Sequence, residues 1–275
     1  MEYIDKNKSR EWAHELIKEF LKRRLEEDGE YPKNLYAAFK GDPECKDAFV
    51  EKILEDNNHR CCYCMRDIKG TTLEHMIPQS VKTQKDFSKY FQNESYLDIS
   101  YMILAQDFLD NPHEVPPYPH TIAYENLIPS CFGNLPSGAP KCCNNYRKDK
   151  FVQPLVFRPN IHEEVKYYGD GNIVWTEEPE DPEYPEGKNP TIVKLGLACL
   201  ELKAIRRIWY YLSSHDLNCE DTNKNLAIDD LLIELGTPKD AEDRNMQQML
   251  INFKKPEYWE LLKKYTYFAN KEIFE

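Results

Sequence analysis

The sequence predicts an α+β protein in which a small zinc-stapled core lies between mainly α-helical N- and C-terminal regions. Three observations support this fold class. Cysteines occur as a Cys-x-x-Cys turn at 61–64 and again between Cys131 and Cys143. Apolar residues recur at helical spacing towards both ends of the chain, and two short apolar segments flank a Gly-Asp-Gly-Asn sequence. We expect four parts: residues 1–55, a core at 56–155, a hairpin and connector at 156–190, and residues 191–275.

The N-terminal region is predicted to be helical. Within residues 9–27, apolar residues at spacings of three to five form one stripe of an amphipathic helix, while the remaining face carries charges of both signs. The stripe consists of Trp12, Leu16 and Phe20 with the neighbouring Ile17, Leu21 and Leu25. A second, shorter helix is expected over residues 48–54, just before the first cysteines.

Nine cysteines favour metal binding over disulfides, because the N-terminus has no apolar segment typical of an export signal. A Cys-x-x-Cys turn puts two thiolates on one side of a loop, and a second pair can complete the tetrahedral shell that zinc prefers. Cys45, Cys199 and Cys219 lie outside these motifs and are expected to be small buried hydrophobic residues. No segment approaches the roughly 18 apolar residues of a membrane span, so we expect a soluble cytoplasmic protein.

Between the two cysteine groups lie residues suited to phosphodiester hydrolysis. His75 is a candidate general base, because a neutral imidazole can take a proton from water near neutral pH. Glu74 and Asn144 are candidate oxygen ligands for one Mg²⁺ or Mn²⁺ ion, which would stabilise the leaving oxygen. A purely structural zinc site has no need of these three residues.

These motifs resemble the HNH endonucleases of the ββα-metal fold, whose zinc-bearing members carry Cys-x-x-Cys, an acidic residue before a His, Asn-Leu, Cys and Cys-Asn. The resemblance covers about residues 56–151. It implies a strand over 71–74, a loop carrying His75, a second strand near Asn126 and a helix over 144–150. It also implies that Glu74 and Asn144 hold the catalytic metal and that Asn126 orients His75 without binding metal.

The same resemblance bears on the zinc ligands. Cys61, Cys64, Cys131 and Cys143 keep both the Cys-x-x-Cys turn and the Cys-Asn step, and we take them as the ligands. Cys62 and Cys142 stay open as replacements for their neighbours, because both positions are doubled. Residues 132–141 form an insertion inside the second cysteine group, and the ligands can still converge because loop-closure entropy grows slowly with length.

A more specific resemblance extends beyond this core. Residues 126–131, 145–151, 168–173 and 191–197 are similar to HNH proteins of retron and Septu-type anti-phage systems. That resemblance implies a nuclease subunit that works with a separate ATPase. The chain has no Gly-x-x-x-x-Gly-Lys-Ser/Thr loop, so P-loop nucleotide binding would have to come from another chain.

A long insertion, roughly residues 78–121, separates the two predicted core strands. Long loops in compact domains are usually functional or disordered. We expect His113 and His120 to be exposed loop histidines, with substrate contact as the alternative. His59, one turn before the cysteines, is expected to have a structural or solvent-exposed role and not to bind the metal.

Beyond the core, apolar residues at 165–168 and 173–175 flank the Gly-Asp-Gly-Asn turn and predict a hairpin. A Pro- and Glu-rich surface connector follows at 177–190. The apolar stripe of residues 200–212 is expected to face the core or a partner. Further helices are expected at 228–235, 241–253 and 256–268.

The net charge of −12 is unusual for a nucleic-acid enzyme, because lysine and arginine contacts to phosphate normally supply affinity. Local basic groups offset it around the last cysteines and after the candidate base. Arg147, Lys148 and Lys150 are the candidate phosphate contacts, and the remaining basic positions are Lys141, Lys82, Lys85 and Lys89. The acidic body predicts weak binding to DNA unless a partner contributes.

Two functions from different classes follow. The first is a metal-dependent HNH endonuclease that hydrolyses phosphodiester bonds in DNA, as the effector of an anti-phage system. The second is a non-catalytic protein-interaction module stapled by zinc. The Glu74-His75 pair together with Asn144 favours the first. A redox role for the Cys-x-x-Cys turn is a distant third, because it would not need the second cysteine group.

Overall fold

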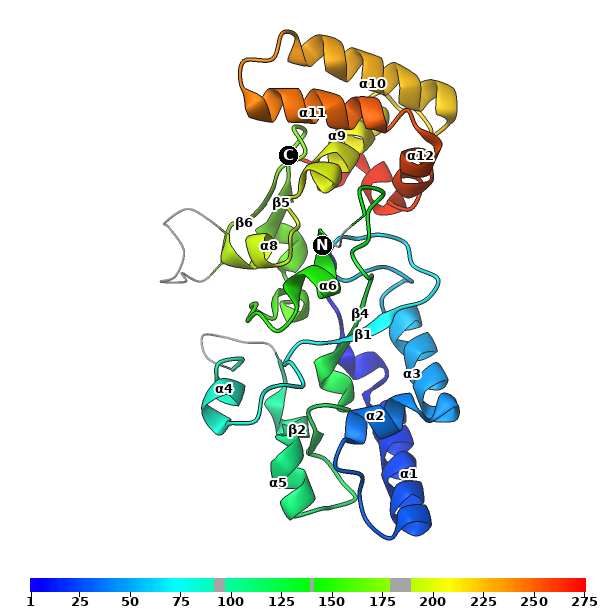
Figure 1. Ribbon diagram of the computed structural model, residues 1–275, viewed down its shortest axis with the longest axis vertical. Coiled ribbons are helices and arrows are strands. Elements are labelled where there is room, and N and C mark those ends of the chain that lie inside the picture. Colours follow the sequence, from blue (N-terminus) through cyan, green and yellow to red (C-terminus); the bar gives the residue numbers. More distant parts are fainter. Residues whose placement is uncertain (92–96, 139–140, 179–188) are drawn as a thin grey trace.

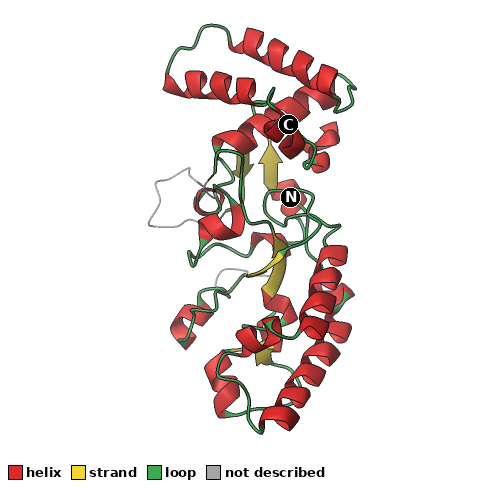
Figure 2. Ribbon diagram, turned by 45° about the vertical axis from the view of Figure 1, so that its right-hand side comes forward, coloured by secondary structure: helices red, strands yellow, loops and turns green. Residues whose placement is uncertain are grey.

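Helices dominate the chain, and strands occur only as two-stranded pairs in the part that the structure describes. The computed structural model describes residues 1–91, 97–138, 141–178 and 189–275 (Figure 1). The protein is α+β, as predicted. In Figures 1 and 2 the N-terminal helices form one end of the molecule and the C-terminal helices form the other. The pairs are β1 (Thr72–His75) with β4 (Leu127–Ser130), β2 (Met102–Ile103) with β3 (Tyr118–Pro119), and β5 (Val165–Tyr167) with β6 (Ile173–Trp175).

Three helices form the N-terminal end: α1 (Arg10–Asp28), α2 (Leu35–Lys40) and α3 (Pro43–Asp56). The predicted stripe of α1 is buried at Ile17, Phe20 and Leu21, together with Ala13, whereas Trp12 and Leu25 lie at its exposed margin. Helix α3 starts earlier than predicted, since the Asp42 side chain accepts a hydrogen bond from the Cys45 N–H and so caps the helix. Helix α2 was not predicted.

The central pair β1–β4 is antiparallel and aligns His75 with Leu127. After β4 the chain crosses residues 132–141 and enters α6 (Cys143–Arg147). This helix is shorter than the predicted 144–150, because Lys148 adopts a positive φ of 54° that ends the α-helical backbone.

The described part of the 78–121 insertion folds around buried aromatic residues. It contains α4 (Gln84–Ser88) and α5 (Ala105–Asp110), and it contributes the parallel pair β2–β3. Phe87, Phe108 and Tyr118 are buried and attach these short elements to the N-terminal half of the chain. Residues 92–96 of the insertion lie outside the described residues.

The predicted hairpin is confirmed by the antiparallel pairing of β5 and β6, which follow α7 (Ile161–Glu164). Of the predicted connector, residues 179–188 lie outside the described residues. Helix α8 (Pro190–Lys194) leads to the helices of the C-terminal end. These helices are α9 (Leu200–Ser214), α10 (Asp221–Leu235), α11 (Ala241–Asn252) and α12 (Pro256–Leu262). Of these, α10 is longer than the predicted helix at 228–235, and α12 is shorter than the predicted helix at 256–268.

Helix α9 buries its predicted apolar stripe, and the C-terminal tail returns to the core. The Tyr265 hydroxyl lies 3.8 Å from the Cys64 Sγ, and the Thr266 hydroxyl donates to Asp67 at 2.7 Å. Among the described residues, no helix is both long and apolar enough to span a membrane. Short 3₁₀ helices occur at Lys6–Lys8, Ile99–Tyr101, Tyr124–Asn126, Leu155–Phe157, Thr266–Ala269 and Lys271–Ile273.

Candidate functional site

Four buried cysteine sulfurs gather between β1–β4 and α6. The Sγ atoms of Cys61, Cys64, Cys131 and Cys143 all lie within 4.8 Å of one another. The pairs Cys61–Cys143 and Cys64–Cys131 are each 3.7 Å apart. A tetrahedral zinc with Zn–S bonds of about 2.3 Å has sulfurs about 3.8 Å apart, whereas a disulfide needs about 2.05 Å. The donor set therefore fits a structural zinc ion, and it is the predicted set.

The backbone of the first cysteine turn is shaped to present two sulfurs. The Met65 N–H donates to the Cys61 carbonyl at 3.0 Å, and the Cys61 N–H donates to the Arg66 carbonyl at 2.8 Å. Met65 adopts a positive φ of 63°, which turns the chain back after Cys64. The Cys131 N–H points at the Cys61 Sγ, 3.4 Å away. Such a donor stabilises negative charge on a thiolate, as a metal-bound sulfur requires.

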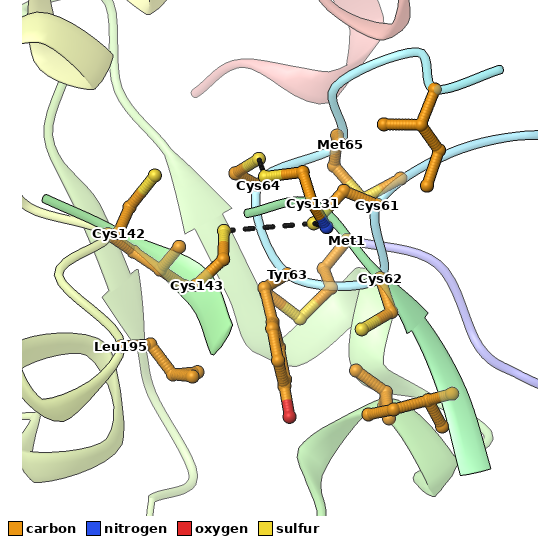
Figure 3. Close-up of a cluster of buried hydrophobic side chains, with 14 of the residues drawn as sticks. Met1, Cys61, Cys62, Tyr63, Cys64, Met65, Cys131, Cys142, Cys143 and Leu195 are labelled. Atoms are coloured by element: carbon orange, nitrogen blue, oxygen red, sulfur yellow. Dashed lines mark hydrogen bonds between the residues drawn. The ribbon is translucent and has the colours of Figure 1, made fainter. Parts of the chain in front are cut away.

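The two alternative cysteines are not members of the four-sulfur set, although Cys142 lies close enough for the thiols of Cys131, Cys143 and Cys64 to lower its pKa. Figure 3 shows the sulfur of Cys143 pointing towards Cys61, while the sulfurs of Cys62 and Cys142 lie to either side of that pair. The Cys142 Sγ instead lies 3.9 Å from the Gly133 carbonyl. Both side chains are buried, so they contribute packing.

The insertion at 132–141 closes on itself and lets the ligands converge. The Lys141 N–H donates to the Gly133 carbonyl at 3.2 Å, which brings the two ends of the insertion together. Gly133 has a φ of 71°, and a Cβ there would lie 1.7 Å from the Cys142 carbonyl oxygen. Only glycine fits this position.

His75 ends strand β1 and is nearly enclosed, with 6% of its surface exposed. Its Nε2 lies 2.9 Å from the Thr121 carbonyl oxygen, which can only accept, so Nε2 carries the hydrogen of the neutral ring. The Nδ1 then keeps its lone pair and lies 3.4 Å from the Gln79 side-chain nitrogen. The Tyr36 ring of α2 packs edge-to-face against the imidazole, with centroids 4.5 Å apart. Burial lowers the pKa of His75 to about 4, so the ring is neutral near pH 7.

Asn126 braces the chain on both sides of His75 and does not bond its ring. Its Oδ1 accepts from the Ile77 N–H at 2.6 Å, and its Nδ2 donates to the carbonyls of Ile77 and His120 at 2.9 and 2.7 Å. It thereby joins the loop that follows His75 to the segment that supplies the Thr121 carbonyl. Its contact with His75 is indirect.

Arg147 does not face solvent, which corrects its predicted role as a phosphate contact. Its guanidinium is fully buried and donates to the Glu74 Oε1 at 2.6 Å, the His75 carbonyl at 3.0 Å and the Met76 carbonyl at 2.6 Å. A side chain with all these acceptors has no exposed donor for substrate. Burial raises the pKa of Glu74, and the adjacent Arg147 charge opposes that shift.

The remaining predicted site residues lie on or just after α6. Asn144 is half-buried in the first turn of the helix, and its carbonyl accepts from the Lys148 N–H at 3.0 Å. Lys148 and Lys150 are exposed, with the Lys150 Nζ 5.0 Å from the centroid of the Tyr146 ring. They stay accessible to a phosphate. The Lys141 side chain is 42% exposed, but its charge is already paired with the buried Glu201 at 2.7 Å.

A cavity of about 300 Å³ lies beside His75 and was not predicted. Gln79 and Thr121, both in contact with His75, line it together with His120. The prediction that His120 is exposed is wrong, because the ring is 1% exposed and packs against Phe87. The uncharged run from Tyr118 to Tyr124 is the sequence signal that could have indicated burial. His113, in contrast, bonds carbonyls of its own loop.

Comparison with known proteins adds no relative. No protein family, curated protein or solved structure matches this chain. Function therefore has to be argued from the geometry of the site itself.

Proposed function

We propose that this protein is a zinc-stapled endonuclease of the HNH type that hydrolyses phosphodiester bonds in DNA. One observation supports it above all others. Strand β1 ends in Glu74-His75, its partner β4 leads into Cys131, and α6 begins at Cys143, so a β–β–α succession surrounds one four-sulfur centre. The ββα-metal core of HNH nucleases has this order of elements.

In this proposal His75 is the general base. The Thr121 carbonyl fixes the hydrogen on Nε2, which leaves the lone pair of Nδ1 to take a proton from water. Asn126 positions the base through the backbone of Ile77 and His120. Lys148 and Lys150 supply positive charge to the phosphate, and a zinc ion bound by the four cysteines would tie the end of β4 to the start of α6.

The predicted Mg²⁺ or Mn²⁺ site at Glu74 and Asn144 is not part of this proposed mechanism. The Glu74 carboxylate as found does not fit a divalent cation, because the Arg147 guanidinium, itself a cation, holds its Oε1 at 2.6 Å. The contribution of such an ion is measured by running the cleavage assay with and without each metal.

A specific observation favours the second candidate, a non-catalytic zinc-stapled interaction module. The Glu74 carboxylate is bonded to Arg147 and the His75 ring is covered by Tyr36, so both residues already have structural contacts. In such a module, loss of the His75 imidazole would cost stability alone. The cleavage experiment separates the two functions.

The proposal includes a separate ATPase partner in an anti-phage system. Two features of the chain support a partner. The net charge of −12 disfavours tight binding to DNA by this chain alone. On α10, Leu226 and Ile233 lie seven residues apart on one face and expose 48% and 76% of their surface. Exposed apolar residues on one helical face suit docking of another protein.

The test is cleavage of supercoiled plasmid and of a short RNA by the purified protein, with Mg²⁺, with Mn²⁺ and without either. His75→Ala is compared with His162→Ala, which removes an exposed histidine on α7. Zinc content and melting temperature are matched first. We expect cleavage of DNA that is lost only in His75→Ala. Equal cleavage by both variants would remove His75 as the base, and no cleavage even with a co-purified partner would favour the interaction module.

A further inference from the structure

We propose that the cavity beside His75 is a binding pocket for a phosphate group of the nucleic-acid strand, built by His120, Thr121, Lys33 and Lys82. This inference rests on the proposed function and assigns the substrate a place in the structure. The pocket lies between four segments of the chain. They are the start of α2, the Gln79–Lys82 loop, helix α5 and the pair His120–Thr121.

Two buried polar side chains that line this pocket lack a well-formed hydrogen bond to a described residue. The His120 ring is 1% exposed and neither of its nitrogens has a partner of good geometry, although the carbonyls of Ile103 and Pro78 lie near enough to oppose the lowering of its pKa by burial. The Thr121 Oγ1 is unpaired in a residue 8% exposed. Buried polar groups without partners are rare, since each costs free energy that folding does not recover. Unpaired donors that line a cavity are best explained by a ligand with acceptor oxygens.

The positive charge around the pocket indicates that its ligand is an anion. Lys33 and Lys82 are exposed at the pocket, neither forms an ion pair with a described residue, and none of its lining residues is acidic. In a chain with net charge −12, such a region is unusual. It attracts an anion, and its two ammonium groups suit the delocalised charge of a phosphodiester.

The pocket is also placed for catalysis. Thr121 lines the pocket, and its carbonyl accepts from the Nε2 of His75. Gln79 lines the same pocket and lies 3.4 Å from the Nδ1 of His75. A phosphate bound here is therefore one side chain away from the nitrogen that acts as the base.

The protonation of His120 fits this task. Burial lowers the pKa of His120 to about 4, so the ring is neutral near pH 7 and has one N–H donor. That N–H and the Thr121 hydroxyl can both donate to phosphate oxygens without adding a buried charge to the empty protein. The lysines at the mouth provide the charge and remain hydrated when no ligand is bound.

Binding is measured by fluorescence anisotropy with a short labelled single-stranded DNA, using the full chain without added Mg²⁺ or Mn²⁺. Lys82→Ala is paired with Lys85→Ala, an exposed lysine of α4 outside the pocket. Each lost phosphate contact should reduce the slope of log affinity against log salt by about 0.7. We expect this change, and weaker binding, for Lys82→Ala and for Lys33→Ala but not for Lys85→Ala.

Thr121→Val separates a ligand contact from a structural role. It removes an unpaired buried hydroxyl while keeping the shape, so the melting temperature should stay equal or rise while DNA affinity falls about tenfold. His120→Leu serves as a second variant of the same kind. Unchanged affinity in these two folded variants, or equal losses for Lys82→Ala and Lys85→Ala, would overturn the pocket.

The outcomes also separate this inference from the proposed function. Binding that depends on Lys82 and Thr121 in a protein that cleaves no nucleic acid would overturn the nuclease activity and keep the pocket. Cleavage that depends on His75, in a protein whose DNA binding ignores Lys82 and Thr121, would overturn the pocket and keep the nuclease.

Discussion

Removing the Arg147 guanidinium should destabilise the whole core, and the size of the effect follows from its contacts. Arg147 is fully buried and bonds Glu74 together with the carbonyls of His75 and Met76. Arg147→Ala would leave the Glu74 carboxylate buried without its counter-charge and two carbonyls without donors. The structure thus predicts a loss of folding stability, in contrast to the surface role that the sequence suggested.

Breaking a buried ion pair by removing one partner costs about 3–5 kcal/mol. The two carbonyls add to this, so about 5 kcal/mol is expected for Arg147→Ala. At about 2.1 cal/mol/K per residue, the unfolding entropy of a 275-residue chain is about 0.6 kcal/mol/K. The melting temperature should therefore fall by about 8 °C. Arg147→Lys keeps the charge but reaches fewer acceptors, so it should recover only part of the loss.

The assay is thermal unfolding followed by circular dichroism, with zinc content measured on the same samples. The matched control is Lys148→Ala, the exposed next residue, which should change stability by less than about 0.5 kcal/mol. The reasoning is refuted if Arg147→Ala melts within about 2 °C of the wild type while cleavage is lost. That result would return Arg147 to the substrate.

Three further predictions concern the zinc centre and the core. Cys143→Ser should lose zinc and unfold cooperatively at lower temperature, whereas Cys142→Ser should keep one zinc per chain by atomic absorption; the reverse result would exchange the two ligands. Gly133→Ala should lower the melting temperature and zinc retention far more than Gly138→Ala, since both have positive φ but only Gly133 meets a carbonyl within 4 Å. Burial lowers the pKa of Lys6 to about 7, so the unfolded chain binds that proton more tightly. Urea unfolding should show wild type gaining about 2 kcal/mol over Lys6→Met between about pH 7 and about pH 9, and a constant difference would contradict the shift.

The zinc ligands could be predicted from the sequence because coordination chemistry restricts both residue type and spacing. Four thiolates around one ion require a turn such as Cys61–Cys64 and a second group that can reach it. Residue spacing alone does not show whether Cys142 or Cys143 is the fourth zinc ligand. That choice depends on which sulfur the backbone of α6 directs inward, and this is a property of three-dimensional structure.

The burial of Arg147 could not be predicted from its neighbourhood, because it lies in the basic sequence Arg-Lys-Asp-Lys. Three of its acceptors lie at the end of β1 and on the residue that follows it, 71 to 73 residues earlier in the chain. The same holds for Tyr36, which reaches His75 from a helix too short to give a periodic signal. Side chains that receive their partners from distant elements are the ones that local patterns misplace.

These distant contacts also determine how a substrate can reach the base. The Thr121 carbonyl holds the Nε2 of His75, and the Tyr36 ring lies edge-to-face with the imidazole at 4.5 Å. The polar atom that remains is Nδ1, and the Gln79 side-chain nitrogen lies 3.4 Å from it. Because Gln79 is exposed and also lines the pocket of His120 and Lys82, a water molecule and a phosphate would approach from that side. His75 and the phosphate pocket are therefore reached from the same side. Because Gln79 is exposed, Gln79→Ala should widen this entrance without lowering the melting temperature. Cleavage that rises or stays equal in Gln79→Ala fits this route, whereas a lower melting temperature would show that Gln79 is a structural part of the core.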